Sequence, residues 1–417
     1  MKVTLRLILI IIFINLNNCK ERTNSTKTES PEMQVEIKKE KIVSKDSINE
    51  SKNTHIPNYY EYYFVSAKSG LNYRKSPKGE ILGKFPLNSR LKVLEKTEIV
   101  DQIKDGKQTL KGKWLGIEKE KDTVYVFDAF LSHNFTYSDL NIYRVKPFNR
   151  EKNGQSTTAF LNLSDSYNIN KSKNNQIFED EDRKGILKDT IILNAQQRKQ
   201  LLKTTNLLES DEIFIYELHT DSIHTYKVKD FQSIACLNIY FNEYSQNFKS
   251  ESDFEFGLDL GQKYKGGYEN FVYIGKENPF QTGKFKPIFW KKVENNEFPI
   301  KKKKSNKRET LSYSYNDLNF YLQKSSESYG SYHLAIINES NDSIIHEKYY
   351  HDSEGTYLRP LNIENKEPFD DCQWAGELFK NRPIIIYGFL GYSFGCQGIS
   401  FLNKDEPPIQ ILCDNRH

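Results

Sequence analysis

The hydrophobic and polar residues of this 417-residue chain alternate in many short runs, which is the pattern of β-strands. Turns rich in Gly and Asn separate these runs in the second half of the chain. We predict strands at 254–260, 268–274, 286–291, 311–323, 332–338, 342–350, 383–390, 398–402 and 409–413. Weaker strand patterns lie at 140–145 and 158–163, and a β-hairpin is expected to turn at Thr220-Asp221. Many short strands favour an antiparallel sandwich or a barrel-like sheet.

Two segments predict helices that pack beside this sheet. Residues 195–208 are rich in good helix formers and follow Asn194, a residue type that caps helix N-termini. Residues 231–240 form an apolar stretch that follows Asp230, a second capping residue. The region beyond the first folded unit is therefore expected to be a β-rich α+β domain.

The first 19 residues form a leader. Lys2 and Arg6 precede an apolar run at 7–14, which is too short to span a bilayer as a helix. Leu16 then stands three positions before Cys19. This arrangement resembles the bacterial lipoprotein signal, which implies that residues 1–18 are removed and that Cys19 carries fatty acyl chains such as palmitate. An uncleaved signal anchor or a soluble secreted protein is the alternative interpretation.

Residues 19–58 have the composition of a tether. No aromatic residue occurs between 20 and 58, and eight basic side chains nearly balance seven acidic ones. Such a segment cannot bury enough apolar surface to fold, so we expect a disordered spacer that holds the folded part away from the membrane.

The composition changes at Tyr59, and five short motifs then follow in order. They are GLNYRKSP at 70–77, ILGKF at 81–85, LKVL at 91–94, KWLGI at 113–117 and VYVFDAFL at 124–131. This progression resembles the bacterial SH3 family, which implies a small, strongly bent barrel over residues 59–133. Between the third and fourth motifs we expect a long polar loop at 97–112.

Bacterial SH3 domains are usually binding modules, so the resemblance also implies a ligand site. Its candidate contact residues are Tyr62, Tyr73, Arg74, Trp114 and Tyr125. Arg74 has the fork of donors that clamps a carboxylate of a peptidoglycan stem peptide. The alternatives are that Trp114 and Tyr73 only fill the barrel and that Arg74 only braces its turn.

The positive charge of the chain is concentrated in two places. Lys and Arg number 60 against 56 Asp and Glu, and eight of the basic residues lie in the leader or between 301 and 308. The remaining surface has no basic field, which disfavours a nucleic-acid binder. We interpret the run at 301–308 as a solvated loop, with contact to anionic lipids or wall polymers as the alternative.

With Cys19 assigned to lipid, an even number of cysteines remains for an oxidising compartment. Cys236, Cys372, Cys396 and Cys413 allow three pairings. Cys396 and Cys413 lie on predicted neighbouring strands, so we expect a disulfide between them. Cys236 falls in the predicted helix 231–240 as a buried thiol.

The sequence does not predict an enzyme, metal or cofactor site. The Asp371-Cys372 pair resembles the nucleophile of papain-like endopeptidases, but that chemistry needs a downstream His, and only the terminal His417 follows. His219 and His224, and likewise His346 and His351, are spaced by five in predicted strands and so fall on opposite faces. No Gly-rich phosphate-binding motif is present in the sequence.

We therefore expect a mainly β protein: an SH3-like barrel followed by a β-rich domain at 134–417, with 134–250 and 251–417 as candidate subdomains. Its expected function is that of a non-enzymatic binding module, lipid-anchored at the outer membrane of the cell envelope, with peptidoglycan or an envelope protein as partner. No cofactor, metal or nucleic acid is expected. A cell-wall hydrolase with an unrecognised catalytic domain is the alternative, and an assembly subunit or an immunity protein is a third class.

Overall fold

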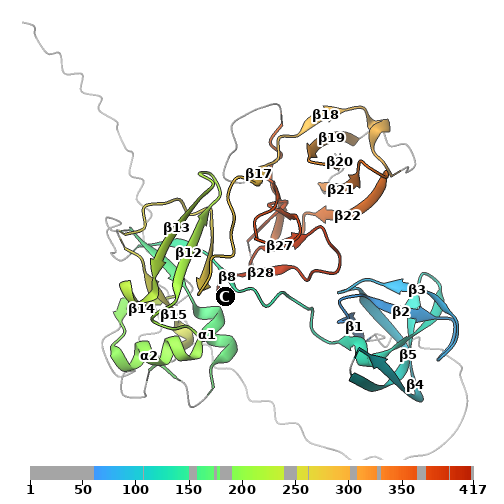
Figure 1. Ribbon diagram of the computed structural model, residues 1–417, viewed down its shortest axis with the longest axis horizontal. Coiled ribbons are helices and arrows are strands. Elements are labelled where there is room, and N and C mark those ends of the chain that lie inside the picture. Colours follow the sequence, from blue (N-terminus) through green and yellow to red (C-terminus); the bar gives the residue numbers. More distant parts are fainter. Residues whose placement is uncertain are drawn as a thin grey trace, which may run out of the picture. The chain divides into compact units, whose positions relative to one another are not determined.

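The computed structural model describes residues 61–106, 108–149, 157–172, 176–178, 190–238, 251–261, 263–300, 308–325, 330–363, 372–393 and 395–414. The expected leader, Cys19 and the expected tether lie outside the described residues, as do residues 301–307 and His417. Within the described part, two α-helices accompany a large number of short strands (Figure 1). The predicted fold class, mainly β with a β-rich α+β region, is confirmed.

The first sheet is formed by seven strands in the order β3-β2-β6-β5-β4-β1-β7, and it curls on itself (Figure 1, blue to teal). The strands are β1 Tyr62–Val65, β2 Leu71–Arg74, β3 Ile81–Phe85, β4 Arg90–Asp105, β5 Gln108–Lys119, β6 Asp122–Phe127 and β7 Leu131–Ser132. Its concave face holds a small core of Val65, Leu71, Leu91, Val93, Leu115, Ile117, Val124 and Val126. Each of these side chains is less than a tenth exposed.

The expected loop at 97–112 is wrong, because this segment extends β4 and β5 into a long hairpin. Ile103 pairs with Leu110 and Asp105 with Gln108, and Gly106 supplies the left-handed turn conformation, with φ 57°. Most of the segment's side chains are polar and exposed, so it lacks the alternation by which a half-buried strand is recognised. The ladder of backbone hydrogen bonds holds it in strand geometry instead.

A five-stranded sheet follows, in the order β11-β14-β15-β10-β9. Its strands are β9 Val145–Asn149, β10 Thr157–Asn162, β11 Thr190–Ile192, β14 Gln232–Leu237 and β15 Phe254–Asp259. Helices α1 Ser164–Asn170 and α2 Ala195–Thr204 lie next to each other and pack on it (Figure 1). Tyr167 of α1 and Leu201 of α2 are fully buried against Phe254 and Phe256 of β15.

A nine-stranded sheet has the order β13-β12-β16-β8-β28-β27-β25-β24-β17. Its strands are β8 Ile142–Tyr143, β12 Glu212–Glu217, β13 Ser222–Lys227, β16 Asn270–Gly275, β17 Phe285–Pro287, β24 Trp374–Gly376, β25 Ile385–Tyr387, β27 Gly398–Phe401 and β28 Ile409–Leu412. β28 pairs in parallel with β8, whereas the other pairings of this sheet are antiparallel. Strands from both sides of residue 250 therefore share one sheet.

Both faces of this sheet are buried. Ile213 and Ile215 of β12 enter one core, which includes residues of the five-stranded sheet, and Phe214 and Tyr216 enter the other. This alternation explains why β12 reads as a continuous apolar run in the sequence.

A further five-stranded sheet, in the order β18-β19-β20-β21-β22, packs around the fully buried Trp290. Its strands are β18 Lys291–Val293, β19 Arg308–Tyr315, β20 Leu318–Ser325, β21 Ser331–Asn338 and β22 Ser343–His351, and β23 Thr356–Leu358 pairs with β26 Leu390–Tyr392. The single strand expected at 311–323 is wrong. The chain turns at Asn316, whose φ is 50°, and splits the segment into β19 and β20.

Of the two predicted helices, one is confirmed and one is wrong. α2 begins at Ala195 with a capping box, in which the Asn194 side chain accepts from the Gln197 N–H at 2.9 Å. Residues 232–237 form strand β14 instead, so Cys236 lies on a strand. β14 runs between β11 and β15 and is buried on both faces, and periodicity alone cannot distinguish such a strand from a buried helix.

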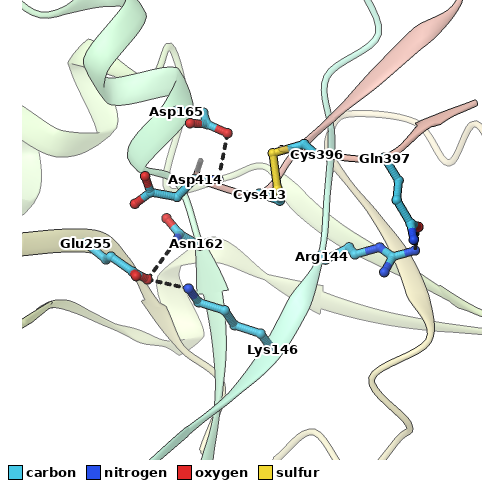
Figure 2. The surroundings of a disulfide bond; sticks show 9 residues. All are labelled: Arg144, Lys146, Asn162, Asp165, Glu255, Cys396, Gln397, Cys413 and Asp414. Carbon is cyan, nitrogen blue, oxygen red and sulfur yellow. Dashed lines mark hydrogen bonds and ion pairs between the residues drawn. A yellow bond between two sulfur atoms is a disulfide. The ribbon is translucent and has the colours of Figure 1, made fainter. Parts of the chain in front are cut away.

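The predicted disulfide between Cys396 and Cys413 is confirmed, with 5.6 Å between the Cα atoms (Figure 2). It joins the segment just before β27 to the residue just after β28, and these two strands are antiparallel neighbours. The adjacent Gln397 accepts a hydrogen bond from Arg144 at 2.9 Å, and the Asp414 N–H donates to Asp165 at 2.8 Å (Figure 2). These contacts fasten the last strand to α1 and to the segment before β9.

Candidate functional site

Strand β5 separates two environments on the first sheet. Leu115 and Ile117 point into the core, whereas Trp114 points to the opposite face and lies across from Phe127 of β6. Trp114 therefore does not fill the barrel core, although it is only 2% exposed. Other residues on that outer face shield the Trp114 ring from solvent.

A groove of about 620 Å³ lies over Trp114. It is bordered by the turn that precedes β2, by β2 and β3, by the end of the β4–β5 hairpin, and by the segment that follows β6. Its lining residues include Ser66–Asn72, Arg74, Lys84, Ile103, Asp105, Leu110, Trp114, Phe127 and Phe130. The volume falls within the range of small-molecule and peptide sites.

The long hairpin builds one wall of this groove. Ile103 of β4 and Leu110 of β5 face each other across the hairpin, and both lie on the same face of the sheet as Trp114. Between Leu110 and Trp114 stands Gly112, where a Cβ atom would lie 2.2 Å from an Asp128 carboxylate oxygen and 3.0 Å from the Phe127 ring. A glycine is required at this position for Phe127 to lie beside Trp114.

Arg74 lies at the edge of the groove. Its guanidinium carbon is 5.7 Å from the centre of the Trp114 ring, and its Nη1 donates a hydrogen bond to the Gly79 carbonyl at 2.6 Å. The residue therefore braces the turn between β2 and β3 and also contributes to the groove. A guanidinium has five N–H donors, and this is the one hydrogen bond that the Arg74 side chain makes to the described residues.

The rim of the groove carries an excess of positive charge. Lys68, Arg74 and Lys84 line it, against a single acidic side chain, Asp105. The stem of Lys84 occupies the space beside Gly70, where a Cβ atom would lie 2.9 Å from the lysine Cδ. Basic groups beside an aromatic floor suit a ligand that joins an apolar portion to a carboxylate or another anion.

The other three predicted contact residues lie outside the groove. Tyr73 packs against Phe85 at a ring distance of 4.7 Å and borders the core. Tyr125 donates its hydroxyl to Glu95 at 3.1 Å, and this hydrogen bond raises the pKa of the phenol. Tyr62 is 38% exposed, and the guanidinium carbon of Arg90 lies 3.9 Å from its ring centre. The structure thus brings Arg74 and Trp114 together and leaves these three tyrosines elsewhere.

Sequence reasoning missed the groove residues supplied by the hairpin, namely Ile103 and Leu110. No signal pointed to them, because the hairpin itself was expected to be a loop. Phe127 and Phe130 belong to the motif at 124–131, and the register of β5 against β6 is what places Phe127 beside Trp114.

Cys372 is fully buried and belongs to the same apolar core as Trp374 and Ile385. Asp371, its predicted partner, lies outside the described residues. A cysteine nucleophile must be reached by its substrate, and this thiol is enclosed. Cys236 is also buried and is not part of a disulfide.

Two histidines pair with carboxylates, and a third is largely buried. His224 lies 3.2 Å from Glu217, and His333 lies 2.8 Å from Glu347. Burial, together with the nearby Lys348, lowers the pKa of His346 to about 4. Among the residues that the structure describes, no three His, Cys, Asp or Glu side chains are gathered as a metal ion would require.

The helices of the described ranges are too short or too polar to cross a bilayer. No protein-family model matches the chain, and neither the curated proteins nor the solved structures contain a match to it.

Proposed function

We propose that this protein is a non-enzymatic binding protein of the bacterial cell envelope, anchored to the membrane by lipid on Cys19. Its SH3-like unit binds, in the groove over Trp114, a peptide segment that carries a carboxylate. The stem peptide of peptidoglycan has this chemistry. The observation that carries the proposal is the placement of Arg74, Lys68 and Lys84 around a tryptophan-floored groove.

The two parts of the groove supply different contributions to binding. Ile103, Leu110 and Phe130 offer a partly exposed apolar surface for the aliphatic portion of a peptide, next to the buried Trp114 and Phe127 rings. The unpaired donors of Arg74 can form charge-assisted hydrogen bonds to a carboxylate, which are stronger than hydrogen bonds between neutral groups. The exposed lysines at the rim attract an anionic ligand from a distance and weaken in this role as salt concentration rises.

Charge reversal at the rim tests the proposal. Purified sacculi are incubated with wild-type protein and with the double variant Lys68→Glu/Lys84→Glu, and the retained fraction is measured. We expect roughly a tenfold loss of affinity, equivalent to about 1.4 kcal/mol. The control is Lys111→Glu/Lys121→Glu, which changes the net charge equally at exposed positions outside the groove.

Retention that falls equally in both double variants would show that sacculi respond to net charge and not to the groove. Retention that is unchanged in Lys68→Glu/Lys84→Glu would remove the groove from binding altogether. Incubation of the same protein with soluble muropeptides, analysed for new products, tests the hydrolase alternative, with Cys372→Ala as its control.

The anchor is tested separately. Growth with radiolabelled palmitate is expected to label the wild-type protein and to leave a Cys19→Ser variant unlabelled, because the acyl chains attach to this thiol. Several acyl chains hold a protein firmly, since each buried methylene contributes about 0.8 kcal/mol. An unlabelled wild-type protein recovered at its full precursor mass would contradict the lipoprotein assignment.

A further inference from the structure

A second and larger cavity, of about 1040 Å³, lies outside the first sheet. Its walls come from the segment that leads into β8, the C-terminal end of α2, the end of β16, and Arg382 in the segment between β24 and β25. Figure 1 shows α2 and β8 in the same part of the fold. The cavity belongs to strands and helices that the groove over Trp114 does not use.

The floor of the cavity is held rigidly by internal hydrogen bonds. The buried Asp211 accepts from the Leu208 N–H at 2.8 Å, and the buried Thr205 donates to the Leu201 carbonyl at 2.9 Å. α2 ends at this point because Asn206 takes the left-handed conformation, with φ 57°, that commonly terminates helices. The turn places the Asn206 side chain at the cavity rim.

The rim, in contrast, offers exposed polar side chains. Its exposed members are Asp139, Asn141, Lys203, Asn206, Lys276 and Glu277. None of them makes a side-chain hydrogen bond or an ion pair with the residues that the structure describes. Their donors and acceptors are therefore available to a ligand.

Two tyrosines belong to the cavity wall: Tyr143 is buried, and the ring of Tyr273 is partly exposed. Tyr273 of β16 is partly buried against the adjacent core, and a Cβ atom at Gly275 would lie 2.8 Å from its ring. The ring therefore rests against the backbone of Gly275. It supplies a flat apolar surface among polar groups.

The charges that line the cavity disfavour a strongly charged ligand. Lys203, Lys276 and Arg382 line the cavity together with Asp139, Asp211 and Glu277, and Arg382 also pairs with Glu406 at 3.0 Å. A phosphate or another anion would meet as many carboxylates as cations, and a large apolar ligand would leave the polar rim unsatisfied. A neutral molecule rich in hydroxyl groups can use both the donors and the acceptors, and its apolar ring faces can rest on a tyrosine.

We propose that this cavity binds a neutral oligosaccharide. The inference is independent of the proposed peptide groove, because the two sites share no residue. It assigns a ligand-binding role to the region beyond residue 134, and it gives the protein two sites of different chemistry.

The test uses the intact protein and isothermal titration calorimetry. The probes are N-acetylglucosamine trimer, cellotriose and maltotriose, each titrated to about 10 mM, which covers dissociation constants up to the millimolar range. Ala-Ala serves as a zwitterionic probe and inorganic phosphate as an anionic one. We expect saturable binding of at least one trisaccharide and none of phosphate.

The variant is Lys203→Gln/Glu277→Gln, which removes one charge of each sign from the rim and leaves the net charge unchanged. It is expected to raise the dissociation constant of the bound trisaccharide about tenfold, because two charged hydrogen-bond partners are lost. The matched control is Lys324→Gln/Glu339→Gln, at exposed positions outside the cavity, and it is expected to leave the constant unchanged.

Gly275→Val provides a second variant, because a side chain there has to displace the Tyr273 ring. It is expected to abolish trisaccharide binding while circular dichroism confirms the fold. The proposal is overturned if no trisaccharide binds, if binding persists unchanged in Lys203→Gln/Glu277→Gln, or if Ala-Ala binds and the sugars do not.

Discussion

The disulfide between Cys396 and Cys413 is expected to stabilise the C-terminal part of the fold by an amount that can be calculated. The cysteines are 17 residues apart in the sequence. Replacing both with serine frees this loop in the unfolded chain, and for a loop of this length the lost constraint corresponds to about 3 kcal/mol. The double variant Cys396→Ser/Cys413→Ser should therefore unfold with a free energy lower by this amount.

The neighbouring contacts explain why the fold itself should survive. Gln397 still accepts from Arg144 and the Asp414 N–H still donates to Asp165, so each strand end keeps one anchor (Figure 2). Neither contact involves sulfur. The expected loss of unfolding free energy therefore arises from the freed unfolded chain alone, because the native pairing of β27 and β28 is retained.

Urea unfolding followed by circular dichroism measures the effect. For a denaturant dependence of about 3 kcal/mol per M, the midpoint of the double variant should fall by about 1 M. Wild-type protein unfolded in the presence of a reductant is the control, and it should match the double variant. A double variant with the midpoint of the oxidised wild type would refute the reasoning, because the loop would then contribute nothing.

Two further predictions concern stability. Burial depresses the pKa of His346 to about 4, so the folded state is destabilised, by about 3 kcal/mol in all, as the pH falls from about 6.5 toward 4 and the unfolded chain takes up a proton first. His346→Leu should flatten this acid dependence of the unfolding free energy in urea titrations between pH 4 and 7.5. The control His351→Leu, at an exposed position on the same strand, should leave it unchanged. Gly257→Ala should cost more than about 3 kcal/mol, since its Cβ would lie 2.1 Å from the Leu161 carbonyl oxygen. Gly267→Ala, which meets open space, should shift the melting temperature little, and equal melting temperatures for the two glycine variants would contradict this.

Features that depend on neighbouring residues were predictable from the sequence. Asn194 followed by Gln197 sets a capping box within one turn, and α2 begins where expected. The strands predicted at 254–260 and 332–338 correspond to β15 and β21, because a short, largely apolar run between turn residues also marks a strand that is buried on both faces. The disulfide followed from cysteines on strands close in sequence.

Features that depend on distant segments were not predictable. Residues 232–237 form a strand because β11 and β15 accept their backbone hydrogen bonds, although the apolar run alone also suits a helix. The parallel pairing of β8 with β28 joins Ile142 to Ile411, and nothing local in either strand specifies it.

The sequence by itself determined the mainly β class, the positions of most strands, and a composition that sets an aromatic-free segment apart from the folded part. Only the tertiary structure decided which side chains meet. Trp114 and Arg74 became part of a groove because the β4–β5 hairpin folds beside them, and the larger cavity draws on segments from residue 139 to residue 382. The physical reason is that backbone conformation follows local preferences, whereas a site forms where distant segments bury their apolar faces together and leave their polar groups converging.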